Sequence, residues 1–170
     1  MSASHYQSLV EKFNGKVIDF VGEQTFVVSP EDYLAAVEFI HSELGFEMLA
    51  SLTAVDYGVQ EEPRYHLFLR FNSIAGHDTL NLRVPVSGQN PKIHSIDKIY
   101  RNANWNEREV FDLFGVHFEE SSDLRRIMMP FDWKGHPLRK DYPLGYEEPQ
   151  FTFNYDEIDG HKPYAVRREE

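Results

Sequence analysis

Residues 107–144 read EREVFDLFGVHFEESSDLRRIMMPFDWKGHPLRKDYPL, the most informative stretch of the chain. Asn106, three residues before Glu109, predicts an N-cap with a capping-box partner at the start of a short helix. Apolar residues at i, i+3 and i+4 from Val110 give this helix one apolar side. Gly115 predicts its end, because glycine adopts a positive φ without steric cost. Beyond it the helical period stops and prolines recur, so we expect an irregular, extended arm.

The arm is rich in the residue types that dominate binding at protein interfaces. These residues are Arg125, Arg126, Trp133, Arg139 and Tyr142. Between residues 124 and 140 five basic residues stand against one acid, in a chain whose net charge is −11. Two interpretations follow from the residues alone. The basic strip meets an acidic partner, or the arm wraps on its own domain and its arginines pair the chain's surplus acids.

Five short motifs follow one another through the stretch. In order they are Glu107-Arg108-Glu109, Asp112-Leu113-Phe114-Gly115, Asp123-Leu124-Arg125-Arg126-Ile127, Pro130 with Asp132-Trp133, and Gly135-His136-Pro137-Leu138-Arg139-Lys140-Asp141-Tyr142-Pro143. Together they resemble the signature of the 30 kDa subunit family of respiratory complex I, which is the C subunit of proton-pumping NADH:quinone oxidoreductase. The plastid and cyanobacterial counterpart of this family is the J subunit. Ser121-Ser122 departs from the pattern, since family members often carry a histidine before the DLRRI run.

The resemblance implies a non-catalytic structural and assembly subunit of the peripheral arm of complex I. Electrons would pass from NADH through FMN and iron–sulfur clusters on other subunits to quinone, coupled to proton translocation, with no self-contained active site and no cofactor in this chain. The implied partners are the D-like subunit of the quinone site, the B-like subunit of the terminal iron–sulfur cluster and the I-like subunit, which is ferredoxin-like. The implied location is the cytoplasmic side of the cell inner membrane, bound peripherally, or the stromal side of the thylakoid in a plastid-type complex.

Within this interpretation the motif residues should form the contact with partner subunits. The expected interface residues are Glu107, Arg108, Arg125, Arg126, Trp133, His136, Arg139, Lys140 and Tyr142. The helix at residues 107–114 should form the base of the arm.

Composition sets the outer bounds of the fold. At 170 residues, 41% apolar and 14% aromatic, the chain suits one folded domain of residues 1–116 with an extended arm of residues 117–170. The net charge argues against a general nucleic-acid binder, which shows a basic footprint. The absence of cysteine excludes disulfides and thiolate metal sites. No apolar run is long enough to span a membrane, and the amino terminus lacks a signal-peptide pattern.

Periodicity predicts the element order α-β-β-α-β-β-β-α. Helices are expected around residues 6–13, 30–44 and 107–114, with a helical segment at 95–100 before the last, and strands at 16–20, 25–29, 46–57, 64–72 and 79–86. Ser29 should cap the second helix with Pro30 in its first turn. Pro85 cannot donate to a ladder, so its strand should be an edge at that end. The fold class is α+β, a two-layer sandwich of a mainly antiparallel sheet with helices on one face.

A second function class uses histidines. His117, Asp132 and His136 are the nearest approach to a metal cluster, which would make the chain a freestanding metal-binding module or small enzyme. Glu109 and Asp112 lie three residues apart on the predicted helix, where such pairs are usually surface charge. No phosphate-binding or dinucleotide-binding glycine motif is present.

Overall fold

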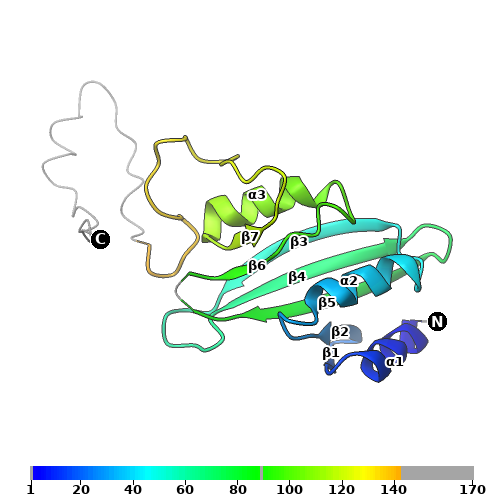
Figure 1. The fold of residues 1–170 in the computed structure, drawn as a ribbon. Coiled ribbons are helices and arrows are strands. Elements are labelled where there is room, and N and C mark those ends of the chain that lie inside the picture. The colour runs from blue at the N-terminus through cyan, green and yellow to red at the C-terminus, as the bar shows by residue number, and fades with distance from the viewer. Residues whose placement is uncertain (1, 89, 143–170) are drawn as a thin grey trace, which may run out of the picture.

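The computed structural model describes residues 2–88 and 90–142 (Figure 1). The elements are α1 (Ser2–Lys12), β1 (Lys16–Phe20), β2 (Glu23–Val27), α2 (Tyr33–Ser42), β3 (Met48–Asp56), β4 (Tyr65–Ser73), β5 (Asp78–Val86), β6 (Lys92–His94), α3 (Ala103–Phe114) and β7 (His117–Glu119). The order predicted from periodicity is confirmed for the eight longer elements. No helix in the described ranges is both long enough and apolar enough to cross a membrane.

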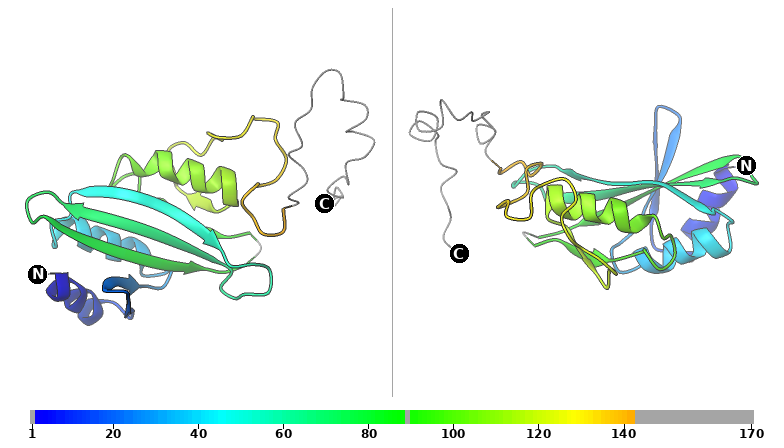
Figure 2. Two further views of the ribbon diagram at one scale, coloured as in Figure 1. Left: turned by 180° about the vertical axis from the view of Figure 1, so that it is seen from behind. Right: turned by 90° about the horizontal axis from the view of Figure 1, so that it is seen from above.

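Five strands form one sheet in the order β1-β2-β5-β4-β3. Every neighbouring pair is antiparallel except β2 and β5, which run parallel, so the sheet is mainly antiparallel as predicted. Figure 2 shows α2 and α3 on one side of this sheet, with the β1–β2 hairpin extending to the other side. The predicted α+β fold, with its helices on one face, is confirmed.

Alternation along the central strands places the core. On β4, Tyr65, Leu67, Leu69 and Phe71 are buried while the residues between them are partly or fully exposed. The alternate residues of β5 are buried in the same way. The period-2 pattern of the sequence therefore identifies the face on which the helices pack.

Pro85 lies in an interior strand, at the end where that strand has one neighbour. It pairs with His66 of β4, whereas the pairing of β5 with β2 ends at Arg83. A residue without an N–H is tolerated there because no second ladder needs its donor. The prediction that this strand lies at an edge of the sheet therefore holds only for the end of β5 beyond Arg83.

The start of α2 differs from the prediction. The helix begins at Tyr33, and residues 30–32 form a turn before it. The Ser29 hydroxyl accepts the N–H of Asp32 at 3.2 Å, so it closes this turn rather than the first turn of the helix.

The start of α3 also differs. Asn102 is its N-cap residue and makes no side-chain cap, while Asn106 lies inside the helix. The Asn102 amide instead donates to the carbonyl of Leu49 on β3 at 2.8 Å. This tertiary contact fixes the start of the helix one turn earlier than the local capping pattern indicates. The end at Gly115 is confirmed, with φ 77° and its N–H donated to the carbonyl of Phe111.

The segment after β6 is not helical. Residues 97–99 form turns, and Ser95 and Ile96 direct their hydroxyl and N–H to Glu107. The two short strands β6 and β7 were not predicted, because three residues are too few to show a period. They pair in parallel, so residues 117–119 lie in a small second sheet and the irregular stretch begins at Glu120.

Candidate partner interface

Residues 120–142 form an irregular segment, here called the strap, that lies against α3 and returns to the end of the large sheet (Figure 1). Its first anchor is the carboxylate of Asp112, which is fully buried on α3. The backbone N–H groups of Ile127, Met128 and Met129 donate to Asp112 Oδ2 at 3.0, 2.8 and 2.8 Å. Arg126 Nη1 lies 2.5 Å from Asp112 Oδ1. One carboxylate thus holds four donors of the strap.

Electrostatics keep this carboxylate ionised. Burial alone would raise the pKa of Asp112, but the N–H of Met129 and the guanidinium of Arg126, with the N–H groups of Met128 and Ile127, outweigh burial and lower that pKa. A charged acceptor makes each of these hydrogen bonds stronger than a neutral one would be.

His136 adds a second contact to the same turn of α3. Its Nδ1 lies 2.9 Å from the carbonyl oxygen of Asp112. Burial lowers the pKa of His136, so the ring is neutral near pH 7 and Nδ1 carries the proton that it donates to this carbonyl. A Cβ on Gly115 would lie 2.6 Å from His136 Cδ2. Gly115 therefore ends the helix and also leaves room for the imidazole.

The first turns of α3 hold the beginning of the strap. Arg108 donates to the carbonyls of Arg125 and Arg126 at 3.0 and 3.2 Å, and Asn104 donates to the carbonyl of Asp123 at 2.9 Å. The Ser122 N–H donates to Asp97 at 2.7 Å. Because these contacts use the strap's backbone, the serines at 121–122 do not interrupt them. The strap therefore lies along α3 from the first turn of the helix to the last.

The far end of the strap is anchored on β3 and on Arg64, the residue that precedes β4. Asp56 is buried and receives the N–H of Lys140 at 2.8 Å together with two bonds from Arg64, at 2.8 and 2.6 Å. Arg64 also contacts Asp141 at 2.9 Å. Burial opposes ionisation of Asp56, but these donors lower its pKa to about 2. The guanidinium carbon of Arg139 lies 5.7 Å from the ring centroid of Tyr65.

The nine motif residues therefore fall into different surroundings. Glu107 is fully buried and accepts bonds from Ser95 and Ile96 at 2.7 and 2.8 Å, and burial raises its pKa. Arg125 has 81% of its side chain exposed and pairs with Asp123. The remaining motif residues, which are half-buried apart from the exposed Lys140, are Arg108, Arg126, Trp133, His136, Arg139, Lys140 and Tyr142.

Two large exposed side chains were not predicted from the sequence. Trp105 on α3 is 60% exposed, and Phe131 in the strap is 95% exposed. Met128 and Leu138 of the strap are also exposed. The sequence feature that could have indicated the exposure of Phe131 is an aromatic residue that directly follows Pro130 in a turn. Isolated exposed hydrophobics are normal, whereas contiguous exposed apolar patches are typical of interaction sites.

The histidine site is not assembled. His117 and His136 face the ring of Phe111, at centroid distances of 6.4 and 5.9 Å. Within residues 2–88 and 90–142, no three histidine, aspartate or glutamate side chains gather in a way that could hold a metal ion. The geometry therefore gives no support to a metal module built on His117, Asp132 and His136.

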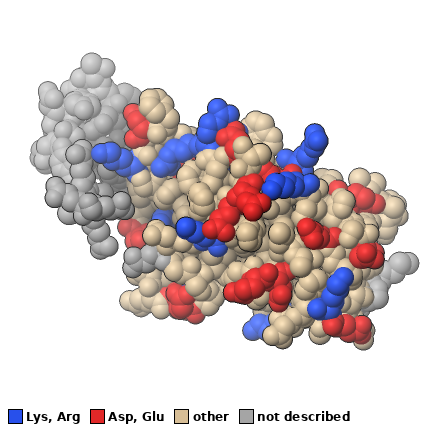
Figure 3. All heavy atoms as spheres, viewed as in Figure 1, with Lys and Arg blue, Asp and Glu red and all other residues tan. Residues whose placement is uncertain are grey.

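Figure 3 shows basic side chains gathered over the strap and α3, interleaved with acidic ones. A family model described as "Respiratory-chain NADH dehydrogenase, 30 Kd subunit" matches residues 26–148. The chain belongs to this family.

Individual relatives give the particular subunit to which the chain is similar. It is 43% identical over 149 residues to the C subunit of the NADH-quinone oxidoreductase of Roseiflexus castenholzii, covering 86% of this chain and 85% of the relative. It is 41% identical over 141 residues to the corresponding C subunit of Trichlorobacter lovleyi, covering 81% and 87%.

Two solved structures share the fold. A trypsin-resistant fragment of Nqo5 superimposes with a TM-score of 0.63 and 26% identity, covering 73% of this chain and all of the fragment. A chain of an archaeal membrane-bound sulfane sulfur reductase, a respiratory membrane complex, superimposes with a TM-score of 0.73 and 18% identity, covering 99% of this chain and 97% of that one. The second likeness concerns the fold alone.

Proposed function

We propose that this chain is a structural subunit of NADH:quinone oxidoreductase, and that its strap docks on neighbouring subunits of the peripheral arm. Family membership supports the first part. The second part is carried by one observation: the strap is fastened along α3, at Asp112 among other contacts, and at its far end to Asp56, yet exposes Phe131, Met128 and Arg125. A segment held firmly with several large apolar side chains exposed is suited to being covered by another chain.

In this role the α+β domain is the support and the strap is the contact. Arg126 and His136 shape the strap from within, while Arg125, Lys140 and the exposed aromatic residues meet the partner. Glu107 holds the 95–96 loop on α3 rather than touching the partner. The interface then has the composition of a hot-spot region, with arginine and aromatic side chains at its centre.

The redox chemistry belongs to other subunits in this proposal. NADH oxidation with FMN, electron transfer through iron–sulfur clusters and quinone reduction take place on neighbours, and this chain has no cysteine with which to hold a cluster. Its partners are the quinone-site, terminal iron–sulfur and ferredoxin-like subunits. It binds peripherally at the cytoplasmic side of the cell inner membrane, or at the stromal side of the thylakoid if the complex is of the plastid type.

A pull-down tests this proposal. The tagged full chain is expressed in its native host, recovered from gently solubilised membranes and analysed by mass spectrometry and quinone-reductase assay. Recovery of iron–sulfur and quinone-site subunits together with activity is the expected result. A single band that carries stoichiometric metal would overturn the proposal and favour the histidine module instead.

A further inference from the structure

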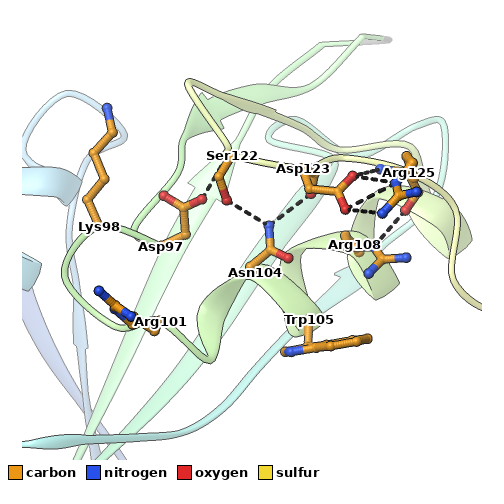
Figure 4. Close-up of a pocket in the computed structure, with 9 residues that line it drawn as sticks. All are labelled: Asp97, Lys98, Arg101, Asn104, Trp105, Arg108, Ser122, Asp123 and Arg125. Atoms are coloured by element: carbon orange, nitrogen blue, oxygen red, sulfur yellow. Dashed lines mark hydrogen bonds and ion pairs between the residues drawn. The ribbon is translucent and has the colours of Figure 1, made fainter.

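A hollow of about 480 Å³ lies beside the first turns of α3, between the loop that precedes the helix and the start of the strap (Figure 4). Trp105 and Arg108 of α3, Arg101 and Lys98 of the loop, and Arg125 of the strap line it. The continuous stretch from the loop into α3 and the start of the strap, more than ten residues further along the chain, thus build this surface together. Trp105, Arg101 and Lys98 all lie outside the five family motifs.

The charge of the hollow is opposite to that of the chain. Four basic residues and two acids, Asp97 and Asp123, line it, whereas the whole chain carries −11. Lys98 pairs with Glu120 and Arg125 pairs with Asp123. Among the described residues, Arg101 and Arg108 have no carboxylate within ion-pair distance, since Arg108 directs its donors to two backbone carbonyls. An outside anion can therefore pair with the guanidinium of Arg101, and with the Nη1 donor of Arg108, whose Nε and Nη2 already hold the strap.

Trp105 supplies an apolar platform next to these charges. The guanidinium carbon of Arg108 lies 5.1 Å from the centroid of the indole, a cation–π contact. The ring is still 60% exposed, and Figure 4 shows it near Arg108, across α3 from Ser122 and Asp123. A large exposed tryptophan held in place by an arginine has the character of an interface anchor.

We infer that this hollow receives an acidic peptide segment of a neighbouring subunit, with carboxylates on Arg101 and Arg108 and an apolar side chain on Trp105. The inference rests on the proposed function, because it requires a partner subunit. Charge complementarity selects the occupant: two guanidinium groups in an acidic molecule match one or two carboxylates, whereas a polyanion would be repelled by the remaining surface. An indole face beside them matches a peptide side chain.

Zero-length crosslinking in the intact complex tests the inference. Carbodiimide couples amines to carboxylates. Lys98 already places one amine in the hollow, and Arg101→Lys adds a second while keeping the charge, so peptide mapping assigns each crosslink to its position. The matched control is Arg70→Lys, an exposed arginine of β4 on the opposite face of the sheet. We expect a crosslink from position 101, and none from position 70, to an aspartate or glutamate of another subunit.

The outcomes separate this inference from the proposed function. If the Arg101→Lys chain co-purifies with other subunits but couples only to its own carboxylates, the hollow is not a docking site and the structural role stands. If the chain recovers no other subunit, the proposed function fails and the inference fails with it.

Truncation of the platform gives a second readout. Trp105→Ala should raise by about thirtyfold the Kd with which the full chain binds a complex purified without this subunit. This is the effect of losing a hot-spot side chain. Ile74→Ala, which truncates a residue that is 66% exposed on the β4–β5 loop, should leave binding unchanged. Equal binding by the Trp105→Ala chain and the wild type would overturn the inference.

Discussion

Arg126 and Asp112, fourteen residues apart, form an ion pair of 2.5 Å in which the carboxylate is fully buried and the guanidinium is mostly so. Three backbone N–H groups share the same carboxylate. Asp112 therefore organises the strap mainly through main-chain donors. The side chains of residues 127–129 are not needed for this anchor.

Asp112→Asn should destabilise the chain by about 3 kcal/mol, because it removes the negative charge and turns one acceptor into a donor facing Arg126 or the N–H groups. Urea unfolding measures the free energy. Asp132→Asn, a change to an exposed strap carboxylate, is the matched control and should cost under about 0.5 kcal/mol. Equal stability of the two variants would contradict the role of Asp112.

Arg126→Ala should loosen the strap next to Asp112 while leaving the domain folded, since it removes the contacts to Asp112 and to the carbonyl of Gly135 but keeps the three backbone N–H bonds. Peripheral subunits should then be released from membranes, with unchanged circular dichroism of the isolated chain. Arg125→Ala breaks an exposed pair with Asp123 and should change stability by less than about 1 kcal/mol. An Arg126→Ala complex that assembles and turns over normally would count against the docking role.

Comparing Gly115→Ala with Gly22→Ala separates the cost of backbone strain from the cost of a steric clash with His136. Alanine at φ 77° costs about 1–2 kcal/mol in strain, and its Cβ would also meet the ring of His136 at 2.6 Å. Gly22→Ala, at φ 83° in the β1–β2 turn, meets nothing within 4 Å and measures strain alone. We expect the larger loss of stability at Gly115, with a shifted His136 resonance in NMR spectra. Equal losses would show that His136 is not held against the helix end.

Acid should loosen the far anchor of the strap. The pKa of Asp56 is lower in the folded chain, about 2, than its ordinary value of 3.8. Its contribution is therefore complete above pH 3.8 and is lost as the pH falls toward 2. The difference corresponds to about 2 kcal/mol. Unfolding free energies of wild type and Asp56→Asn should converge across this window, and parallel pH curves would contradict the assignment.

The features that depend on local pattern could be predicted from the sequence. Alternation on β4 and the glycine that ends α3 are encoded by neighbouring residues, and both are confirmed. The predicted start of α3 was wrong because Asn102 bonds to β3, a contact invisible to a capping rule. The anchors of the strap could not be predicted, since backbone N–H groups leave no residue signature. Trp105 was missed because its exposure depends on which side of α3 packs on the sheet.

The attachment of the strap at Asp112 and again at Asp56 makes it a closed loop of chain rather than a free tail. Its shape is therefore set by the isolated polypeptide, before any other subunit arrives. A partner that meets such a surface has less conformational freedom to remove from it, so more of the contact energy remains for binding. In the proposed role, this chain would therefore fold first and offer its neighbours a surface that is already formed.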